Sequence, residues 1–534
     1  MPQENASAQT QSIQQHGQGQ QVLDLDVLIV GAGVSGLATA HELRKRAPDL
    51  KLLIVEAKSR VGGRTLTVEM KGRTDKMEKF DLGGQWVGKT QSHILEIMKE
   101  FKIQTYDQYT DGIKLAQMGD VNELRPYVSA LSEKNLRHYT EVELLDFFTN
   151  TNKLKALCDK LDLIEIFESQ DAEVLDQMTV SQWTRDNCQT DTVEDVMELG
   201  SRIVYGVPFT RMSMLYHLFF SKSAGGYQNL VESIGDGAQA IRLHGGTQQI
   251  SERLAQPFIE NNTLKMNTAV SRIDIDTQTG LARVRMYDTK NKDAVLRMQI
   301  VRAKRVIMAI PPTECGKLRW VPEVPFMKRR LFDNMYFGNM IKFVVTYKRA
   351  FWREKGYSGE VVSMGRTNEE GEMLPVVDAY DGCAPGGTPA IVGFMREEYA
   401  DYTKELRCKE AVDDLARIYG DEAQDFIDYD EKVWGQEPFN GGCPVAYVPP
   451  GQMDAFAAIR EPHHNVHFAG TESATHWMGY MSGAVQAGRR AAHEVLHMLD
   501  RDDVVHFSYL TDSTFAAGFL EKQQQGATQP KSKM

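Results

Sequence analysis

Near the start of the chain, a run of apolar residues leads directly into three glycines spaced G-x-G-x-x-G. The run ends at Val30, and the glycines are Gly31, Gly33 and Gly36. An unbroken run of Val, Leu and Ile predicts a strand buried on both faces, and a helical pattern follows from Ser35. Gly31 permits the tight turn, Gly33 lets the backbone approach a pyrophosphate, and Gly36 lets helix and strand pack closely. The helix N-terminus then offers free N–H groups to a diphosphate. The chain is therefore predicted to open with a dinucleotide-binding unit.

Further segments extend this motif. A second strand, residues 52–55, ends in Glu56, where an acid can accept hydrogen bonds from ribose hydroxyls. Residues 57–65 read A-K-S-R-V-G-G-R-T, and residues 81–87 read D-L-G-G-Q-W-V. With these segments in this order, the sequence resembles the flavin-containing amine oxidases, which are two-domain FAD enzymes, and among them the monoamine oxidases. The resemblance covers residues 24–500.

The resemblance implies an α/β fold with a Rossmann-like FAD-binding domain and a substrate domain of mixed sheet and helices. The FAD-binding domain is expected to be discontinuous and to comprise residues 22–104, 244–320 and 433–500, with the substrate domain in residues 105–243 and 321–432. Periodicity predicts mostly helices over residues 105–243. Residues 1–21 are rich in Gln, Ser and Gly and are predicted to be disordered, and residues 501–534 are expected to be a polar C-terminal tail.

FAD is the cofactor that the resemblance implies. Its binding residues are then expected to be Gly31, Gly33, Ser35, Gly36, Glu56, Arg64, Gly84, Gln85, Trp86, Val270, Trp434, Cys443, Gly470, Thr471, Glu472, Tyr480 and Met481. In monoamine oxidases, the cysteine of a G-G-C segment forms a thioether with the flavin 8α-methyl group, and Cys443 occupies that place. A lone cysteine is otherwise a small buried apolar residue, so non-covalent FAD is the alternative. The helix near Met481 is expected to direct its N-terminus at the flavin pyrimidine ring, where reduced flavin carries negative charge.

Two residues are expected to take part in catalysis. In the family, a lysine after the A-I-P-P turn reaches a water next to flavin N5, and Lys317 follows that turn here; a surface lysine is the alternative. Tyr480 corresponds to one of two aromatic residues that flank the amine. The place of the other holds Pro444. The Cys443–Pro444 peptide bond is expected to be cis, because monoamine oxidases have a cis bond there.

The substrate cavity is expected to include Gln239, Tyr357, Phe394 and Pro444. The activity that the resemblance implies is oxidative deamination of primary amines, including aryl-alkyl amines, to aldehyde, ammonia and hydrogen peroxide with O2. Hydride, nucleophilic and radical cleavage of the α-C–H bond all remain open. Two other functions are kept as alternatives. One is a polyamine or diamine oxidase, which needs acids along the cavity to hold a distal ammonium group, and the other is a non-catalytic flavoprotein that serves as a binding module.

Net charge, cysteine spacing and the length of apolar stretches restrict the kinds of partner that the protein is expected to bind. The net charge of −12 argues against nucleic acid or an anionic membrane. The six cysteines form no C-x-x-C pair, so neither a metal site nor a disulfide framework is expected. No apolar stretch reaches the roughly 18 residues of a membrane span, and residues 521–534 are polar, so we expect a soluble protein without a membrane anchor. The expected partners are a small-molecule amine, O2 and, in a homodimer, a second copy of the chain.

The last three residues concern location in the cell. Ser532, Lys533 and Met534 differ at one position from the S-K-L peroxisomal import signal. A peroxide-producing oxidase also belongs beside catalase. The peroxisome is therefore the expected location, with the cytoplasm as the alternative.

Overall fold

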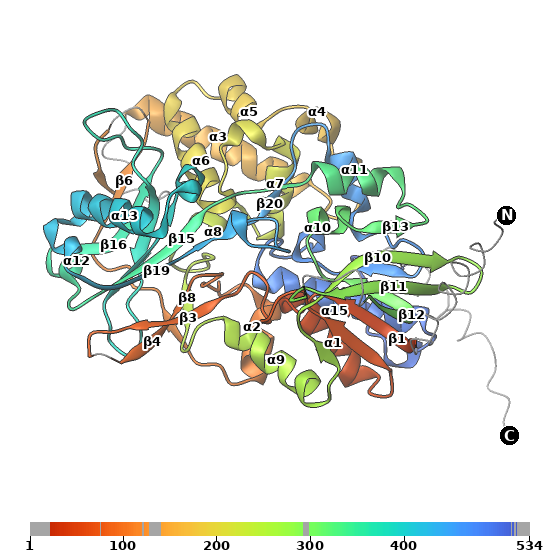
Figure 1. The fold of residues 1–534 in the computed structure, drawn as a ribbon. Helices are drawn as coiled ribbons and strands as arrows, with labels where there is room; N and C mark the ends of the chain where they lie inside the picture. The colour runs from red at the N-terminus through yellow and green to blue at the C-terminus, as the bar shows by residue number, and fades with distance from the viewer. Residues whose placement is uncertain are drawn as a thin grey trace, which may run out of the picture.

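The structure is a computed structural model that describes residues 22–74, 76–119, 122–127, 140–291, 298–513, 515–516 and 520. Two large sheets organise it (Figure 1). The first sheet has β1 (Leu23–Val30) at its centre, with β2 (Leu52–Val55) on one side and β12 (Gln299–Met308) on the other, all parallel. Its order is β13-β10-β11-β12-β1-β2-β9, with β21 also paired to β12. The remaining strands are β9 (Leu264–Lys265), β10 (Thr268–Asp276), β11 (Leu281–Asp288), β13 (Arg319–Val321) and β21 (Val466–Phe468).

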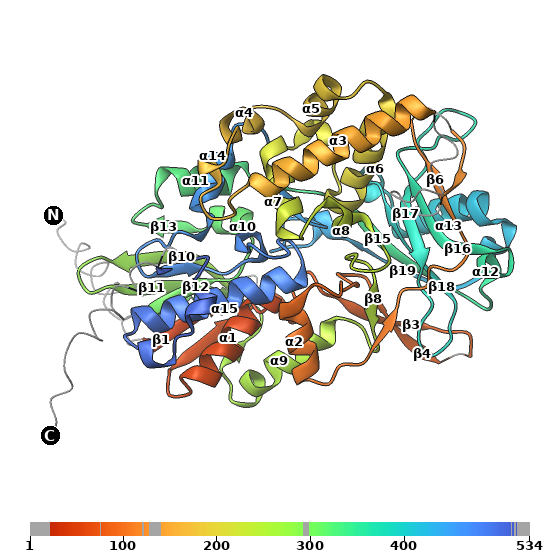
Figure 2. The same cartoon turned by 180° about the vertical axis from the view of Figure 1, so that it is seen from behind.

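Helices bury one face of this sheet. Helix α1 (Val34–Arg46) and helix α15 (Met481–Met498) lie side by side, and α2 (Ser92–Glu100) and α9 (Gln248–Glu260) complete the layer (Figure 2). Alternate residues of β1 enter two cores: Val27 and Ile29 pack toward the helices, while Leu28 and Val30 pack toward β10–β12. Burial on both faces is what the apolar run of β1 predicts.

The second sheet has seven strands in the order β19-β15-β18-β17-β16-β6-β7. The strands are β6 (Ile113–Gln117), β7 (Arg125–Tyr127), β15 (Ile341–Tyr347), β16 (Tyr357–Ser363), β17 (Val376–Asp381), β18 (Ala390–Met395) and β19 (Phe426–Val433). Helices α12 (Phe351–Glu354) and α13 (Lys404–Tyr419) share an apolar core with this sheet. Among the described residues, three small two-stranded sheets accompany the large ones. The consecutive strands β3 (Thr67–Lys71) and β4 (Met77–Asp81) form one of them. The other two join segments distant in the sequence: β5 (Thr105–Asp107) with β8 (Ile241–Leu243), and β14 (Tyr336–Phe337) with β20 (Ala446–Tyr447).

A helical layer lies beside both sheets (Figures 1 and 2). It consists of α3 (Glu141–Lys160), α4 (Ala172–Asp176), α5 (Val180–Asn187), α6 (Asp191–Tyr205), α7 (Met214–Ser223) and α8 (Tyr227–Val231). Nearby lie α10 (Pro312–Gly316), α11 (Phe326–Asn334) and α14 (Met453–Phe456). The structure confirms that the described part of the 105–243 segment is mostly helical, and it adds the short strands β5, β6 and β7 before α3. These strands are short. β5 and β6 pair with β8 and β16, which are distant in the sequence, and β7 pairs with the nearby β6.

The segment after residue 500 is not simply a polar tail. Leu510 is fully buried, Ser513 donates a hydrogen bond to Glu494, and Tyr509 stacks on His493. The expected tail 501–534 is therefore corrected for this first part, which lies against α15. Residues 1–21 and the Ser532–Met534 tripeptide lie outside the described residues. Within the described part of the chain, no helix combines the length and apolar character needed to cross a bilayer.

Candidate active site

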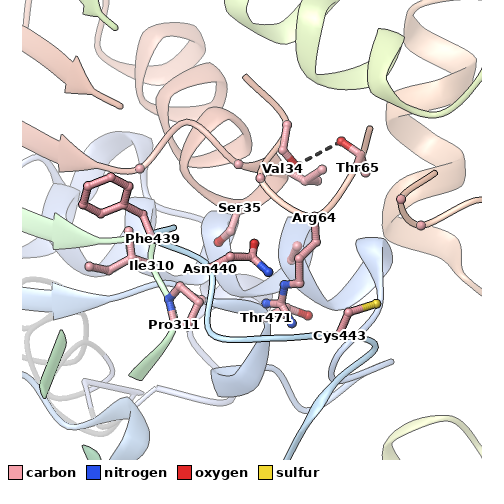
Figure 3. A pocket seen from close by; sticks show the side chains of 18 of the residues that line it. Val34, Ser35, Arg64, Thr65, Ile310, Pro311, Phe439, Asn440, Cys443 and Thr471 are labelled. Carbon is pink, nitrogen blue, oxygen red and sulfur yellow. Dashed lines mark hydrogen bonds between the residues drawn. The ribbon is translucent and has the colours of Figure 1, made fainter. Parts of the chain in front are cut away.

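A cavity of about 500 Å³ runs from the first glycine turn to the second sheet. Figure 3 shows that separate segments line it, with Ser35, Arg64, Asn440, Cys443 and Thr471 gathered around one space. Its lining includes most of the predicted site residues: Gly31, Gly33, Ser35, Glu56, Arg64, Gly84, Gln85, Trp86, Gln239, Val270, Lys317, Phe394, Cys443, Pro444, Gly470, Thr471, Glu472, Tyr480 and Met481. The fold therefore brings together residues spread over more than 400 positions of sequence.

The glycines at one end form an open cradle. A Cβ at Gly33 would meet nothing closer than 3.9 Å, and one at Gly84 nothing within 4 Å. A Cβ at Gly36, by contrast, would lie 2.0 Å from the carbonyl oxygen of Gly31, so Gly36 serves helix–strand packing and does not line the cavity. Glu56 accepts a hydrogen bond from the N–H of Ala32 at 2.8 Å, which fixes its carboxylate beside the turn.

Polar atoms without a partner point to a polar ligand in this cradle. Arg64 and Glu472 form a 2.6 Å ion pair, yet Nη1 of Arg64 and Oε2 of Glu472 have no hydrogen-bond partner among the described residues. The same holds for Nε2 of Gln85. Buried polar groups are normally paired. The open glycine cradle and these unpaired atoms fit the dinucleotide part of FAD, and Met481 brings the N-terminus of α15 to the same cavity.

Cys443 is one of the residues that line the cavity. Burial raises the pKa of its thiol to about 12, although the positive charges of Lys342 and Arg64 act in the opposite direction. The Cys443–Pro444 bond is cis, which confirms that expectation. Trp434 does not line the cavity: it is fully buried, and its indole N–H donates to the carbonyl of Leu82 at 2.8 Å. The prediction that Trp434 contacts the cofactor is corrected, because its ring is buried outside the lining and its N–H is bonded to Leu82.

Lys317 and Lys342 both line the cavity, and the catalytic role expected of Lys317 stays a prediction. The side chain of Lys317 is 68% exposed, and its ammonium group pairs with Glu314 at 2.6 Å at the edge of the cavity. Lys342 instead lies inside: it is 1% exposed, donates to the carbonyl of Gly83 at 2.8 Å and to Gln85 at 3.0 Å, and lies over the ring of Trp86. Burial lowers the pKa of Lys342 to about 7. Sequence reasoning did not single out Lys342, because a lysine inside the buried strand β15 looks like part of a sheet core in the sequence.

Aromatic and amide side chains line the other end. Trp86 lies 5.2 Å from Tyr380 and 6.4 Å from Phe394, between ring centroids. Gln239, Phe394, Pro444 and Tyr480 line the cavity as predicted.

Tyr357 is not among the lining residues. It begins β16, and its ring packs 5.9 Å from that of Tyr419 on α13, so the prediction for Tyr357 is corrected. Besides Lys342, the lining residues that sequence reasoning missed include Asp378 and Tyr380 of β17. Their alternation in V-V-D-A-Y-D was the available signal, since residues two apart on a strand share a face.

Comparisons with known proteins agree with this site. The sequence model of the family described as flavin containing amine oxidoreductase matches residues 34–496. Flavin-containing amine oxidase B of Bos taurus is 33% identical over 487 residues, which are 89% of this chain and 87% of the bovine protein. The Homo sapiens amine oxidase B is 32% identical over 487 residues, with the same coverage.

Solved structures extend the likeness to the fold. Cyclohexylamine oxidase from Brevibacterium oxydans has a TM-score of 0.76 at 27% identity, over 90% of this chain and 100% of that one. Putrescine oxidase bound to putrescine has a TM-score of 0.77 at 25% identity, over 89% and 100%. These matches confirm the predicted two-domain α/β fold and FAD as the cofactor. The chain belongs to the flavin-containing amine oxidase family.

Proposed function

We propose that this FAD-dependent amine oxidase converts a neutral primary amine, O2 and water into an aldehyde, ammonia and hydrogen peroxide. The observation that carries the proposal is the single cavity that joins the glycine cradle, Cys443 and an aromatic pocket. Bound FAD supplies the two-electron acceptor for the amine and passes the electrons to O2. The protein orients the amine and keeps bulk water from it.

Residues of the aromatic end have distinct tasks in this proposal. Tyr480 and Pro444 flank the amine near the flavin, so a single aromatic ring orients it. Trp86 and Phe394 wall the cavity and exclude water, which strengthens polar interactions inside it. Lys342, with a pKa of about 7, holds or releases a proton near neutral pH, and its hydrogen bonds to Gly83 and Gln85 fix the position of its amine.

The cofactor is further proposed to be covalently attached through the sulfur of Cys443. Its support is the presence of Cys443 in the wall of the cavity that the glycine cradle also lines, together with the G-G-C segment. Burial raises the pKa of this thiol, and the positive charges of Lys342 and Arg64 offset part of that rise, so they would assist loss of the thiol proton when the cofactor is attached there.

The activity is tested with purified holoenzyme. A visible flavin spectrum that bleaches under anaerobic conditions with an amine, and peroxide release when air is admitted, are the expected results. A panel of arylalkyl, alkyl and polyamine substrates then orders the substrates by kcat/KM. A flavin spectrum that no amine bleaches would favour the non-catalytic alternative and would contradict the proposal.

Peroxisomal location and a homodimer are proposed as well. The support for the first is the terminal Ser-Lys-Met. A fluorescent protein carrying residues 521–534 is expected to enter peroxisomes, and a fusion whose last residue is deleted should stay diffuse. A diffuse signal from the intact tail would leave the cytoplasm as the location.

Light scattering of the holoenzyme, which measures its molar mass in solution, tests the proposed homodimer.

A further inference from the structure

One acidic side chain lies in the aromatic end of the cavity. In the second sheet, Lys342 of β15 pairs with Phe394 of β18, and Phe394 pairs with Asp378 of β17. Residues paired in register on antiparallel strands project from the same face of the sheet. Lys342, Phe394 and Asp378 therefore form a row, and all three line the cavity.

Asp378 differs from two other buried acids of the second sheet and its helix, Asp381 and Asp414. It is 2% exposed, and its Oδ1 has no hydrogen-bond partner among the described residues. Asp381, three residues further along β17, instead pairs with Arg353 and accepts the indole N–H of Trp352. Asp414 pairs with Arg366 at 2.6 Å. A buried carboxylate oxygen without a donor is costly, and its position in the cavity wall makes a ligand the available source of a donor.

The groups around Asp378 define what that donor is. Lys342 faces it from β15, the hydroxyl of Tyr380 from β17, and the carboxylate of Glu360 acts on it from β16. Desolvation raises the pKa of Asp378 to about 8 despite Tyr380 and Lys342. Since Lys342 forms no ion pair with Asp378 and has its hydrogen bonds to Gly83 and Gln85, the carboxylate lacks a dedicated cation. A pKa of about 8 leaves Asp378 mostly protonated at neutral pH while the site is empty. A cationic N–H donor brought by the ligand would favour the ionised carboxylate and supply both charge and hydrogen bonds.

We propose that Asp378 binds a second, protonated amino group at the far end of the substrate, so that the preferred substrates are aliphatic diamines. This inference rests on the proposed oxidation of a neutral amine beside Tyr480. The reacting amine lies near Tyr480 and Pro444, the methylene chain passes between the rings of Trp86 and Phe394, and the distal ammonium group reaches Asp378. Tyr380 adds a hydroxyl beside the same carboxylate.

The test compares a homologous series of α,ω-diamines with n-alkylamines and ω-amino alcohols of the same length, using anaerobic flavin reduction and steady-state kcat/KM. The proteins are wild-type holoenzyme, Asp378→Asn and Asp378→Glu. Asp430→Asn is the matched control, because Asp430 lies in the same sheet but pairs with Lys404 outside the cavity. Flavin content and melting temperature show that each variant is folded and loaded.

The wild type is expected to prefer the best diamine over its matched n-alkylamine by at least about tenfold in kcat/KM. Asp378→Asn should lower kcat/KM for diamines on the order of 100-fold and leave that for n-alkylamines within about threefold. Asp378→Glu should retain a diamine preference with a changed optimal chain length, and Asp430→Asn should behave as wild type.

Other outcomes contradict the inference. The anchor role of Asp378 is wrong, while the proposed function stands, if n-alkylamines reduce the flavin as well as diamines do. The same holds if Asp378→Asn lowers kcat/KM equally for diamines and for n-alkylamines. If amino alcohols surpass diamines, the distal group is a hydroxyl and the ammonium assignment is wrong. If no amine reduces the flavin, the proposed function fails and this inference fails with it.

Discussion

Lys342 and Lys317 line the same cavity, but Lys342 is buried whereas the side chain of Lys317 is exposed to solvent. Replacing Lys342 by Met removes the buried amine that donates to Gly83 and Gln85. We expect Lys342→Met to slow flavin reduction or reoxidation on the order of 100-fold, because a proton-transferring group with a pKa near the working pH contributes about that much. Lys317→Met, which removes only an exposed ion pair with Glu314, should change both rates less than about threefold.

Stopped-flow measurement of both half-reactions separates the two lysines. Flavin content of both variants is compared first, so that loss of cofactor is not read as loss of rate. Equal losses of rate in Lys342→Met and Lys317→Met would show that Lys342 has no special role. A loss of rate confined to Lys317→Met would support the catalytic role that the sequence predicts for Lys317.

Cys443 offers a second test at this scale. Denaturation of the wild type in acid is expected to leave the yellow colour in the protein pellet, because a thioether survives unfolding. Cys443→Ser should release its flavin into the supernatant while still binding it when folded, since the glycine cradle and Arg64 are intact. Colour in the supernatant of the wild type would show that FAD is held without a covalent bond.

At the scale of the element, the turn between β1 and α1 has two glycines with different tasks. In Gly36→Ala, the new Cβ would lie 2.0 Å from the carbonyl oxygen of Gly31, so strand and helix must separate. We expect a loss of stability of at least about 1–3 kcal/mol even without cofactor. In Gly33→Ala, the nearest atom lies 3.9 Å away, so the apoprotein should be nearly as stable as wild type but bind FAD poorly.

Thermal melts of the apoproteins, followed by titration with FAD, distinguish these effects. The prediction is contradicted if both apoproteins melt as wild type does, or if Gly33→Ala takes up FAD normally. The same comparison tests whether the open space at Gly33 belongs to the cofactor.

At the scale of the whole molecule, Asp378 couples folding to pH. Its folded pKa of about 8 exceeds the ordinary value of 3.8, so the folded state binds more protons than the unfolded state between these values. Its contribution to stability therefore falls as pH rises, by up to about 1.4 kcal/mol per pH unit. The lowered pKa of Lys342, about 7, adds a slope of opposite sign only above pH 7.

The window between pH 4 and 7 thus isolates Asp378. Asp378→Asn has no carboxyl group at this position to titrate, so it does not lose stability there as the pH rises. The melting temperature of the variant relative to wild type should therefore rise from pH 5 to pH 7. The control Asp430→Asn should show no such trend. A difference between Asp378→Asn and wild type that stays constant across the window would show that Asp378 titrates alike in the folded and unfolded states.

Local sequence determined the dinucleotide-binding turn, because glycine spacing, an apolar run and a helical pattern are all properties of neighbouring residues. The order of such segments also indicated the family, FAD and the place of Cys443. Gly36 was assigned to packing from spacing alone, and the 2.0 Å approach to Gly31 bears this out. These assignments need no knowledge of which strands pair.

The aromatic end of the cavity depended on tertiary structure. Lys342, Asp378 and Phe394 lie on three strands separated by up to 52 residues, and their neighbourhood exists only through the β15–β18–β17 pairing. The exposure of Lys317, the packing of Tyr357 on Tyr419 and the burial of Leu510 against the rest of the molecule likewise depend on distant partners. A sequence pattern records which faces of an element are apolar, whereas the partner of each face is decided by the packing of the whole chain.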